Sequence, residues 1–120
     1  QPIKGTLIIS PKSGELKRDT EMFGKMDPFI IFFHGKEKKK TSVCTDGGKT
    51  PHWNDTIGLD FDSSEAKSFF EVYDEESMGK NKLIAVGELP IQSVITQGGN
   101  YSGNVPVFWD KKPIGNINME

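Results

Sequence analysis

The apolar residues of this chain fall into short runs, and turn-forming residues separate each run from the next. No run approaches the roughly 20 apolar residues that a membrane-spanning helix needs. Short runs about ten residues apart are typical of an all-β sandwich or barrel. The 13 glycines and 7 prolines among 120 residues supply the turns that such a fold requires. We therefore predict an all-β fold.

Eight segments have the pattern of strands, and together they predict an antiparallel β-sandwich. They lie at residues 5–10, 29–33, 40–45, 56–61, 68–73, 83–91, 104–109 and 114–119. Residues 11–26 are polar and irregular in pattern, so we expect a loop there. Gly87 within a strand suggests a β-bulge, and residues 91–97 are the one helical candidate. The length matches a single domain over residues 1–120.

Charge and cysteine content limit the class of protein. The formal net charge is -2, whereas a nucleic-acid-binding domain normally shows a basic excess, so we expect no nucleic-acid partner. Cys44 is the single cysteine and cannot form an internal disulfide, which fits a reducing compartment such as the cytoplasm. The chain carries no nucleophile motif, phosphate-binding loop or zinc pattern, so we expect a monomeric binding protein and not an enzyme.

Four segments and one threonine carry a family resemblance. The segments are residues 23–30 (FGKMDPFI), 50–55 (TPHWND), 70–76 (FEVYDEE) and 82–85 (KLIA), and Thr41 follows a basic stretch. In this order and spacing the chain resembles a C2 domain of the permutation found in phospholipases and novel protein kinases C, called type II. Small single-domain C2 proteins of plants and protists are similar. The resemblance implies an eight-stranded β-sandwich that docks on anionic phospholipid membranes, often with calcium held by acidic loops.

The resemblance also implies a calcium site in the first and third loops. The matching positions are Glu21, Asp27, Asp74 and Glu76. Glutamate replaces the usual aspartate at two of them, and Lys82 stands at the last acidic position. Calcium takes six to eight oxygen ligands, and an ammonium group has no lone pair to offer. We expect calcium binding to be weakened or lost, with the Lys82 ammonium able to take the cation's place, and both outcomes stay open.

A run of lysines follows the second predicted strand. If it is extended, Lys36, Lys38 and Lys40 share one face. Each basic residue near an anionic membrane contributes roughly 1 kcal/mol of attraction, and the resemblance puts this run on the family's phosphoinositide-binding face. Lysines also protect exposed strand edges from aggregation, so a solvated edge is the alternative.

Three apolar residues are expected at loop tips, Met22 and Phe23 in the first loop and Met78 in the third. Exposed apolar residues on neighbouring loops are typical of a surface that something covers. The resemblance implies that they contact the membrane, as in calcium-dependent C2 domains, and the alternative is that Phe23 folds back onto its own loop. Together these features predict a cytoplasmic module that is peripheral to membranes and binds anionic phospholipid. The alternative is a calcium-independent C2 scaffold that acts in protein–protein interactions.

Overall fold

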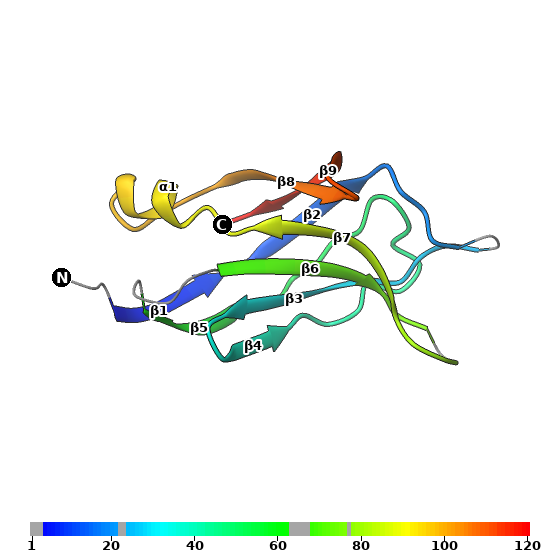
Figure 1. Cartoon of the computed structure of the whole chain (residues 1–120), viewed down its shortest axis with the longest axis horizontal. Coiled ribbons are helices and arrows are strands. Elements are labelled where there is room, and N and C mark those ends of the chain that lie inside the picture. Colours follow the sequence, from blue (N-terminus) through cyan, green and yellow to red (C-terminus); the bar gives the residue numbers. More distant parts are fainter. Residues whose placement is uncertain (1–3, 22–23, 63–67, 77) are drawn as a thin grey trace.

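Strands account for most of the chain, and one short helix lies between two of them (Figure 1). The computed structural model describes residues 4–21, 24–62, 68–76 and 78–120. Within these residues the elements are β1 (Lys4–Ile9), β2 (Pro11–Leu16), β3 (Pro28–His34), β4 (Glu37–Lys40), β5 (Ile57–Asp62), β6 (Ser68–Asp74), β7 (Lys82–Glu88), α1 (Ile91–Thr96), β8 (Gly103–Trp109) and β9 (Lys112–Met119). No helix among the described residues is long and apolar enough to cross a membrane.

The strands form two antiparallel sheets. β1 pairs with β5 in a two-stranded sheet, and the remaining strands form a seven-stranded sheet in the order β2-β9-β8-β7-β6-β3-β4. The pairing of β2 with β9 brings the first part of the chain beside its last strand. The larger sheet curls, so that β2 lies behind the strands in the middle of the sheet (Figure 1). The predicted all-β antiparallel sandwich is confirmed.

One apolar core fills the space between the sheets. Side chains alternate along each strand, and Ile30, Phe32, Phe70 and Val72 point inward from β3 and β6 with no exposed surface. Ile117 of β9 joins the same cluster from the other end of the sheet. Burying one such side chain contributes about 1.5–3 kcal/mol of folding free energy. This core fixes the strand ends from which the loops emerge.

The stretch expected to be an irregular loop contains a strand, β2, so the described residues hold nine strands instead of eight. Only Pro11, Gly14 and Leu16 of this strand are buried, whereas Lys12 and Glu15 are exposed, so its sequence lacks an apolar strand pattern. Gly14 packs closely against β9, where a side chain would meet the Ile117 side chain. Pairing with β9, which is distant in sequence, makes this segment a strand.

The strand expected at residues 40–45 is displaced toward the lysines. β4 covers Glu37–Lys40 and ends one residue before Thr41. The Thr41 hydroxyl oxygen accepts a hydrogen bond from the Ile30 amide at 3.0 Å, while the Thr41 amide donates to the Ile30 carbonyl at 2.9 Å. The buried threonine side chain thus replaces a backbone partner at the end of the ladder.

Two further predictions concern the helix at residues 91–97 and the β-bulge at Gly87, and only the helix is confirmed. The helix is confirmed as α1, and Gly98 and Gly99 follow it with φ values of 78° and 96°. The bulge expected at Gly87 lies instead at Ile84, because Val72 pairs with Ala85 and Tyr73 with Leu83. Gly87 makes room for the Phe70 ring, which a side chain there would overlap.

Candidate functional site

Two loops meet at one end of the sandwich, on the right in Figure 1. One joins β2 to β3 and the other joins β6 to β7. Pro28 and Asp74 are cross-strand partners, so the end of the first loop and the start of the second lie side by side. The Asp27 amide donates to a carboxylate oxygen of Asp74 at 2.8 Å, and the Glu75 amide donates to the Asp27 carbonyl at 3.0 Å. Antiparallel pairing of β3 with β6 therefore brings acidic residues from both loops together.

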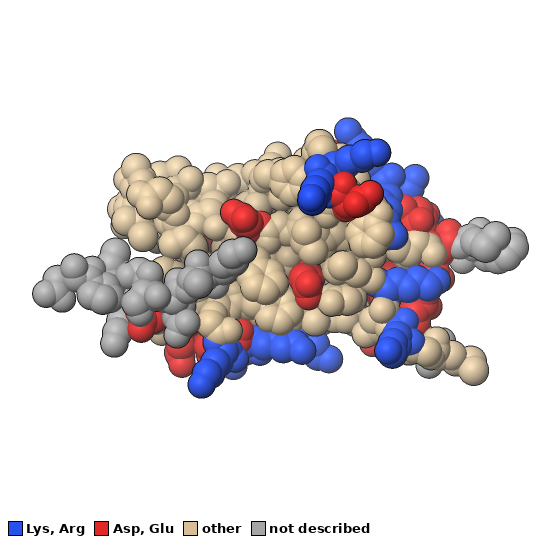
Figure 2. All heavy atoms as spheres, viewed as in Figure 1, with Lys and Arg blue, Asp and Glu red and all other residues tan. Residues whose placement is uncertain are grey.

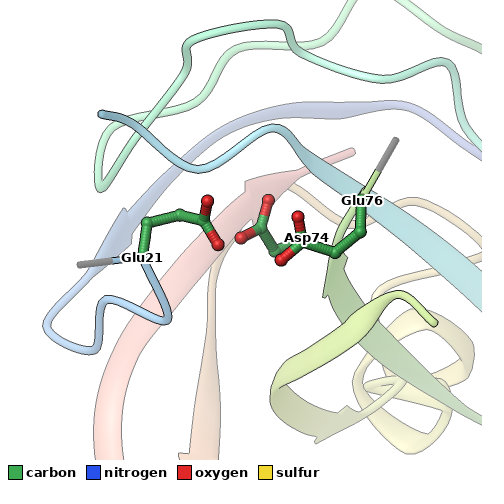
Figure 3. A group of neighbouring side chains, drawn as sticks. All are labelled: Glu21, Asp74 and Glu76. Carbon is green, nitrogen blue, oxygen red and sulfur yellow. The ribbon is translucent and has the colours of Figure 1, made fainter. Parts of the chain in front are cut away.

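Glu21, Asp74 and Glu76 form the acidic cluster shown in Figure 3. One oxygen of each carboxylate lies within 4.8 Å of the others. Asp74 is almost fully buried, with 1% of its surface exposed. Its second oxygen accepts a hydrogen bond from the Thr20 hydroxyl at 2.7 Å, so both oxygens of this buried charge are satisfied.

Lys82 brings a positive charge to the acidic cluster. Its ammonium group lies 2.9 Å from a Glu76 oxygen and 3.1 Å from a Glu21 oxygen. It also donates to the Thr20 carbonyl at 3.3 Å. Lys82 reaches this position because it is the cross-strand partner of Asp74 in the β6–β7 ladder. The ammonium thus connects the first loop to the third.

Charge in the cluster shifts two pKa values. The carboxylates of Glu76 and Glu21 raise the pKa of the Lys82 ammonium above its ordinary 10.5. Lys82 lowers the pKa of Glu21, but Asp74, Glu76 and burial oppose it, and the net pKa of Glu21 lies above its ordinary 4.5. One ammonium therefore offsets only part of the repulsion among three carboxylates.

Asp27, the fourth predicted calcium ligand, is not part of the acidic cluster. One of its carboxylate oxygens accepts a hydrogen bond from the Asp46 amide at 2.8 Å. Asp46 has a positive φ of 57°, a conformation that Asp tolerates better than most residues. The Asp27 carboxylate thus holds a neighbouring turn.

The lysine run forms an exposed edge of the larger sheet. β4 is the last strand of that sheet, and Lys38, Lys39 and Lys40 are all exposed. Figure 2 shows lysines gathered along the lower edge of the molecule, over β4. Lys36 lies in the tight turn that precedes β4, so it is exposed but is not part of the extended strand on which its alignment was predicted.

The outer face of β3, β4 and β6 combines lysines with apolar side chains, and we call it the lysine–aromatic face. It consists of Lys38 and Lys40 with their cross-strand partners Phe33 and Ile31, and of Phe69 on β6. Phe33 and Phe69 stack with ring centroids 4.7 Å apart, and the Lys38 ammonium lies 5.9 Å from the Phe33 ring centre. Sequence reasoning missed these apolar residues as surface residues.

The sequence predicts three membrane contacts at loop tips: Met22, Phe23 and Met78. Met78 is 89% exposed, which fits a side chain at the tip of the β6–β7 loop. Met22 and Phe23 lie outside the described residues. Contact of any of the three with a membrane stays a prediction.

Family comparison agrees with the fold and the two loops. A profile of the C2 domain matches residues 5–107, and this chain belongs to the C2 domain family. Members of this family commonly bind membranes, lipids or proteins, and most are modules without catalytic activity.

Two curated relatives are similar to the chain. Elicitor-responsive protein 1 of rice (Oryza sativa subsp. japonica) is 25% identical over 79 residues, which cover 62% of this chain and 50% of the relative. The 16 kDa phloem protein 1 of Arabidopsis thaliana is 27% identical over 99 residues, which cover 78% of this chain and 64% of the relative. The chain therefore spans about half to two thirds of the length of these relatives.

A solved structure confirms the architecture. The structure of a C2 domain-containing protein from a putative elicitor-responsive gene superposes with a TM-score of 0.79 at 21% identity. The match covers 97% of this chain and 85% of the other. At this identity the likeness establishes the fold alone.

C2 domains often bind calcium, so the acidic cluster has to be tested for its fit to that ion. Calcium takes six to eight oxygen ligands. Both Asp74 oxygens already accept hydrogen bonds, and the Lys82 ammonium lies against Glu21 and Glu76 where a metal ion would need to bind. The donor set does not fit calcium while Lys82 stays in place.

Proposed function

We propose that this domain docks on anionic phospholipid membranes through the lysine–aromatic face, without requiring calcium. The observation that carries the proposal is the position of Lys38 and Lys40, which are exposed on the same face as the stacked pair of Phe33 and Phe69. Ammonium groups attract lipid phosphates, and aromatic rings suit the boundary between headgroups and acyl chains. The face offers both.

Carboxylates near the lysines limit where the attraction acts. Glu71 and Glu88 lie on the same outer face of the sheet, across from Ile31 and Phe69. The Tyr73 hydroxyl donates to Glu71 at 2.9 Å. The four lysines at residues 36–40 project from the edge of the sheet, beyond these acids. We therefore propose that the β4 edge meets the membrane first.

The loop end supports docking without calcium. Three carboxylates and one ammonium leave the acidic cluster with a net negative charge, so the cluster itself does not attract an anionic surface. Lys82 takes the position that a bound cation would need. We therefore assign the attraction for anionic lipid to the lysine–aromatic face. Met78, on the β6–β7 loop, is a separate exposed apolar residue.

The same reasoning extends to location and class. A domain that docks by surface charge is peripheral, and the single Cys44 fits the cytoplasm. We propose a monomeric, non-catalytic binding module at the cytoplasmic surface of a membrane.

Vesicle co-sedimentation tests the proposal. The variant carries Lys38→Ala and Lys40→Ala, and the matched control carries Lys12→Ala and Lys49→Ala, two exposed lysines near β2. Vesicles contain phosphatidylcholine with phosphatidylserine or a phosphoinositide, and each run is made with calcium and with a chelator. Two lysines at roughly 1 kcal/mol each predict that the variant binds about 30-fold more weakly, while the control keeps its binding.

Each result of the vesicle experiment distinguishes docking through the lysine–aromatic face from an alternative. Equal loss in the variant and the control would leave only nonspecific charge, and binding that needs calcium would contradict the role given to Lys82. No binding to any anionic vesicle would favour the second candidate, a calcium-independent protein-interaction scaffold. The specific observation for that candidate is that Lys82 forms ion pairs with both Glu21 and Glu76.

A further inference from the structure

A second group of exposed apolar and basic residues lies around the hairpin that joins β8 to β9. Val86, Phe108 and Trp109 are each 37% exposed. Lys111 and Lys112 are exposed in the hairpin itself. We call these five residues the hairpin patch. Figure 2 shows lysine and arginine side chains gathered at the upper right of the molecule, where Figure 1 shows the end of β8.

A tight turn holds the tip of this hairpin in one conformation. Trp109 pairs with Lys112, and the two residues between them, Asp110 and Lys111, have positive φ values of 51° and 67°. Two successive residues of this kind form the type I′ turn that closes a two-residue hairpin. The aromatic ring and the two lysines therefore extend from a defined turn at the end of two strands.

Arg18, in the loop between β2 and β3, packs on the ring of Trp109. Its guanidinium carbon lies 3.7 Å from the centre of that ring, and its Nη1 donates a hydrogen bond to the Leu83 carbonyl at 3.0 Å. A guanidinium group over an aromatic face is attracted by the charge distribution of the ring. Arg18 thus adds a positive charge beside the hairpin patch and connects the hairpin to β7.

The hairpin patch shares the outer face of the larger sheet with the lysines of β4. Val86 is the cross-strand partner of both Phe108 and Glu71. Ile31 is the partner of both Glu71 and Lys40. Cross-strand partners lie on the same face of a sheet, so one row of side chains crosses five strands from Lys40 to Phe108. Neighbouring strands lie about 4.8 Å apart, which separates the two ends of the row by about 19 Å.

The buried centre of the acidic cluster lies on the other side of this sheet. Along β6, Phe70, Val72 and Asp74 are buried, whereas Glu71 and Tyr73 alternate with them on the outer face. A flat surface on the outer face would therefore meet basic residues at both ends of the row, with Asp74 behind the sheet.

We propose that the hairpin patch is a second contact with anionic phospholipid, so that the domain lies on a membrane with the outer face of its larger sheet toward the lipid. This contact rests on the membrane docking proposed above and adds a second site and an orientation to it. Lysines attract lipid phosphates, and a tryptophan ring suits the depth of the headgroups. A bilayer is flat and continuous, so it can meet both ends of the row at once. Two contacts on one rigid sheet bind more strongly than either alone, because the second forms within the bound molecule.

Tryptophan fluorescence tests whether lipid covers the hairpin patch. Trp109 is 37% exposed, whereas Trp53 is 6% exposed and its indole nitrogen donates to the Pro28 carbonyl at 3.3 Å. Acrylamide in solution should therefore quench Trp109 far more than Trp53. Vesicles of phosphatidylcholine and phosphatidylserine should lower the quenching of Trp109, because lipid covers the exposed part of its ring. The Trp109→Phe variant, which keeps only Trp53, should not show this change.

A matched pair of lysine variants tests the charge of the hairpin. Lys111→Gln with Lys112→Gln removes both hairpin charges, and the control, Lys12→Gln with Lys49→Gln, removes two charges near β2. The attraction expected for two lysines near an anionic membrane predicts that the hairpin variant binds phosphatidylserine vesicles about 30-fold more weakly. The control should keep its binding. All four lysines are exposed, so both variants should fold, which circular dichroism checks.

The outcomes distinguish the hairpin contact from docking through β4. If the parent binds vesicles while the quenching of Trp109 is unchanged, or if the hairpin variant binds as the control does, the hairpin contact is wrong and docking through the lysine–aromatic face stands. If the hairpin variant loses binding but Lys38→Ala with Lys40→Ala does not, the hairpin contact is supported and the role given to β4 is wrong. No binding to any anionic vesicle would overturn both. Shielding of Trp109 by polyglutamate but not by vesicles would assign the patch to an acidic protein segment and overturn the lipid contact.

Discussion

Lys82 contacts both of the loops that meet at the acidic end of the sandwich. Its backbone belongs to β7, directly across from the buried Asp74, and its ammonium lies between carboxylates of two loops. A metal ion in this position would also supply positive charge, but it would dissociate when the concentration of the free ion falls. The lysine ties Thr20 and Glu21 of the first loop to Glu76 of the third with a charge that belongs to the chain.

Replacing Lys82 with a carboxylate should create a calcium site. Lys82→Asp removes one positive charge and adds one negative charge beside Glu21, Asp74 and Glu76. We expect calcium affinity, measured by isothermal titration calorimetry, to increase at least about tenfold over the parent protein. The control is Lys80→Asp, with the same change in charge at an exposed position of the same loop. Equal affinities for the parent and Lys82→Asp would mean that the ammonium does not compete with the ion.

The contribution of Lys82 to stability should disappear at high pH. The folded protein raises the pKa of Lys82 above its ordinary 10.5, so it holds this proton more tightly than the unfolded chain does. The stabilisation is complete below pH 10.5 and is lost as the pH rises through the folded-state pKa. The difference in unfolding free energy between the parent and Lys82→Met, measured with urea, should therefore shrink above pH 10.5. For Lys80→Met the difference should stay level, and a level difference for Lys82→Met would refute the linkage.

Among the elements, β4 depends on the residue that follows it. Thr41 is 4% exposed. Its hydroxyl oxygen accepts a hydrogen bond from the Ile30 amide, and its hydroxyl group donates a hydrogen bond to the Ser42 carbonyl. This arrangement ends the β3–β4 ladder beside the core. It thereby fixes the strand that presents Lys38 and Lys40.

Thr41→Val should destabilise the domain by about 1–3 kcal/mol, because the buried Ile30 amide loses its partner without a change in side-chain shape. Chemical denaturation measures the change. Thr45→Val, an exposed position in the following loop, is the matched control and should change stability by less than about 0.5 kcal/mol. Similar effects for the two variants would show that the Thr41 hydroxyl is not needed to end β4.

At the scale of the whole molecule, local patterns were sufficient where a strand has one apolar face. The alternation in residues 56–61 predicted β5, the segment at residues 68–73 predicted β6, and the motif around Asp27 predicted the start of β3. Antiparallel pairing of β3 with β6 then brings Glu21, Asp74 and Glu76 to one end, as the sequence predicted. The position of Lys82 follows from the neighbouring ladder, in which β6 pairs with β7.

Features that depend on distant partners could not be read from the sequence. β2 has a polar sequence and becomes a strand only beside β9. The run from Phe29 to Phe33 is apolar at every position, so no alternation distinguished the core residue Phe32 from the outer residue Phe33.

Because the Lys82 charge is covalently attached, the charge of the acidic cluster does not change when the concentration of a free ion changes. A loop end that relies on a free ion follows every rise and fall of that ion, and its membrane contact comes in pulses. An ammonium carried by β7 is supplied at a constant local concentration and cannot be chelated away. If the domain docks on a membrane as proposed, its residence there would follow the slow turnover of the lipids beneath it, and brief ionic signals would not change it.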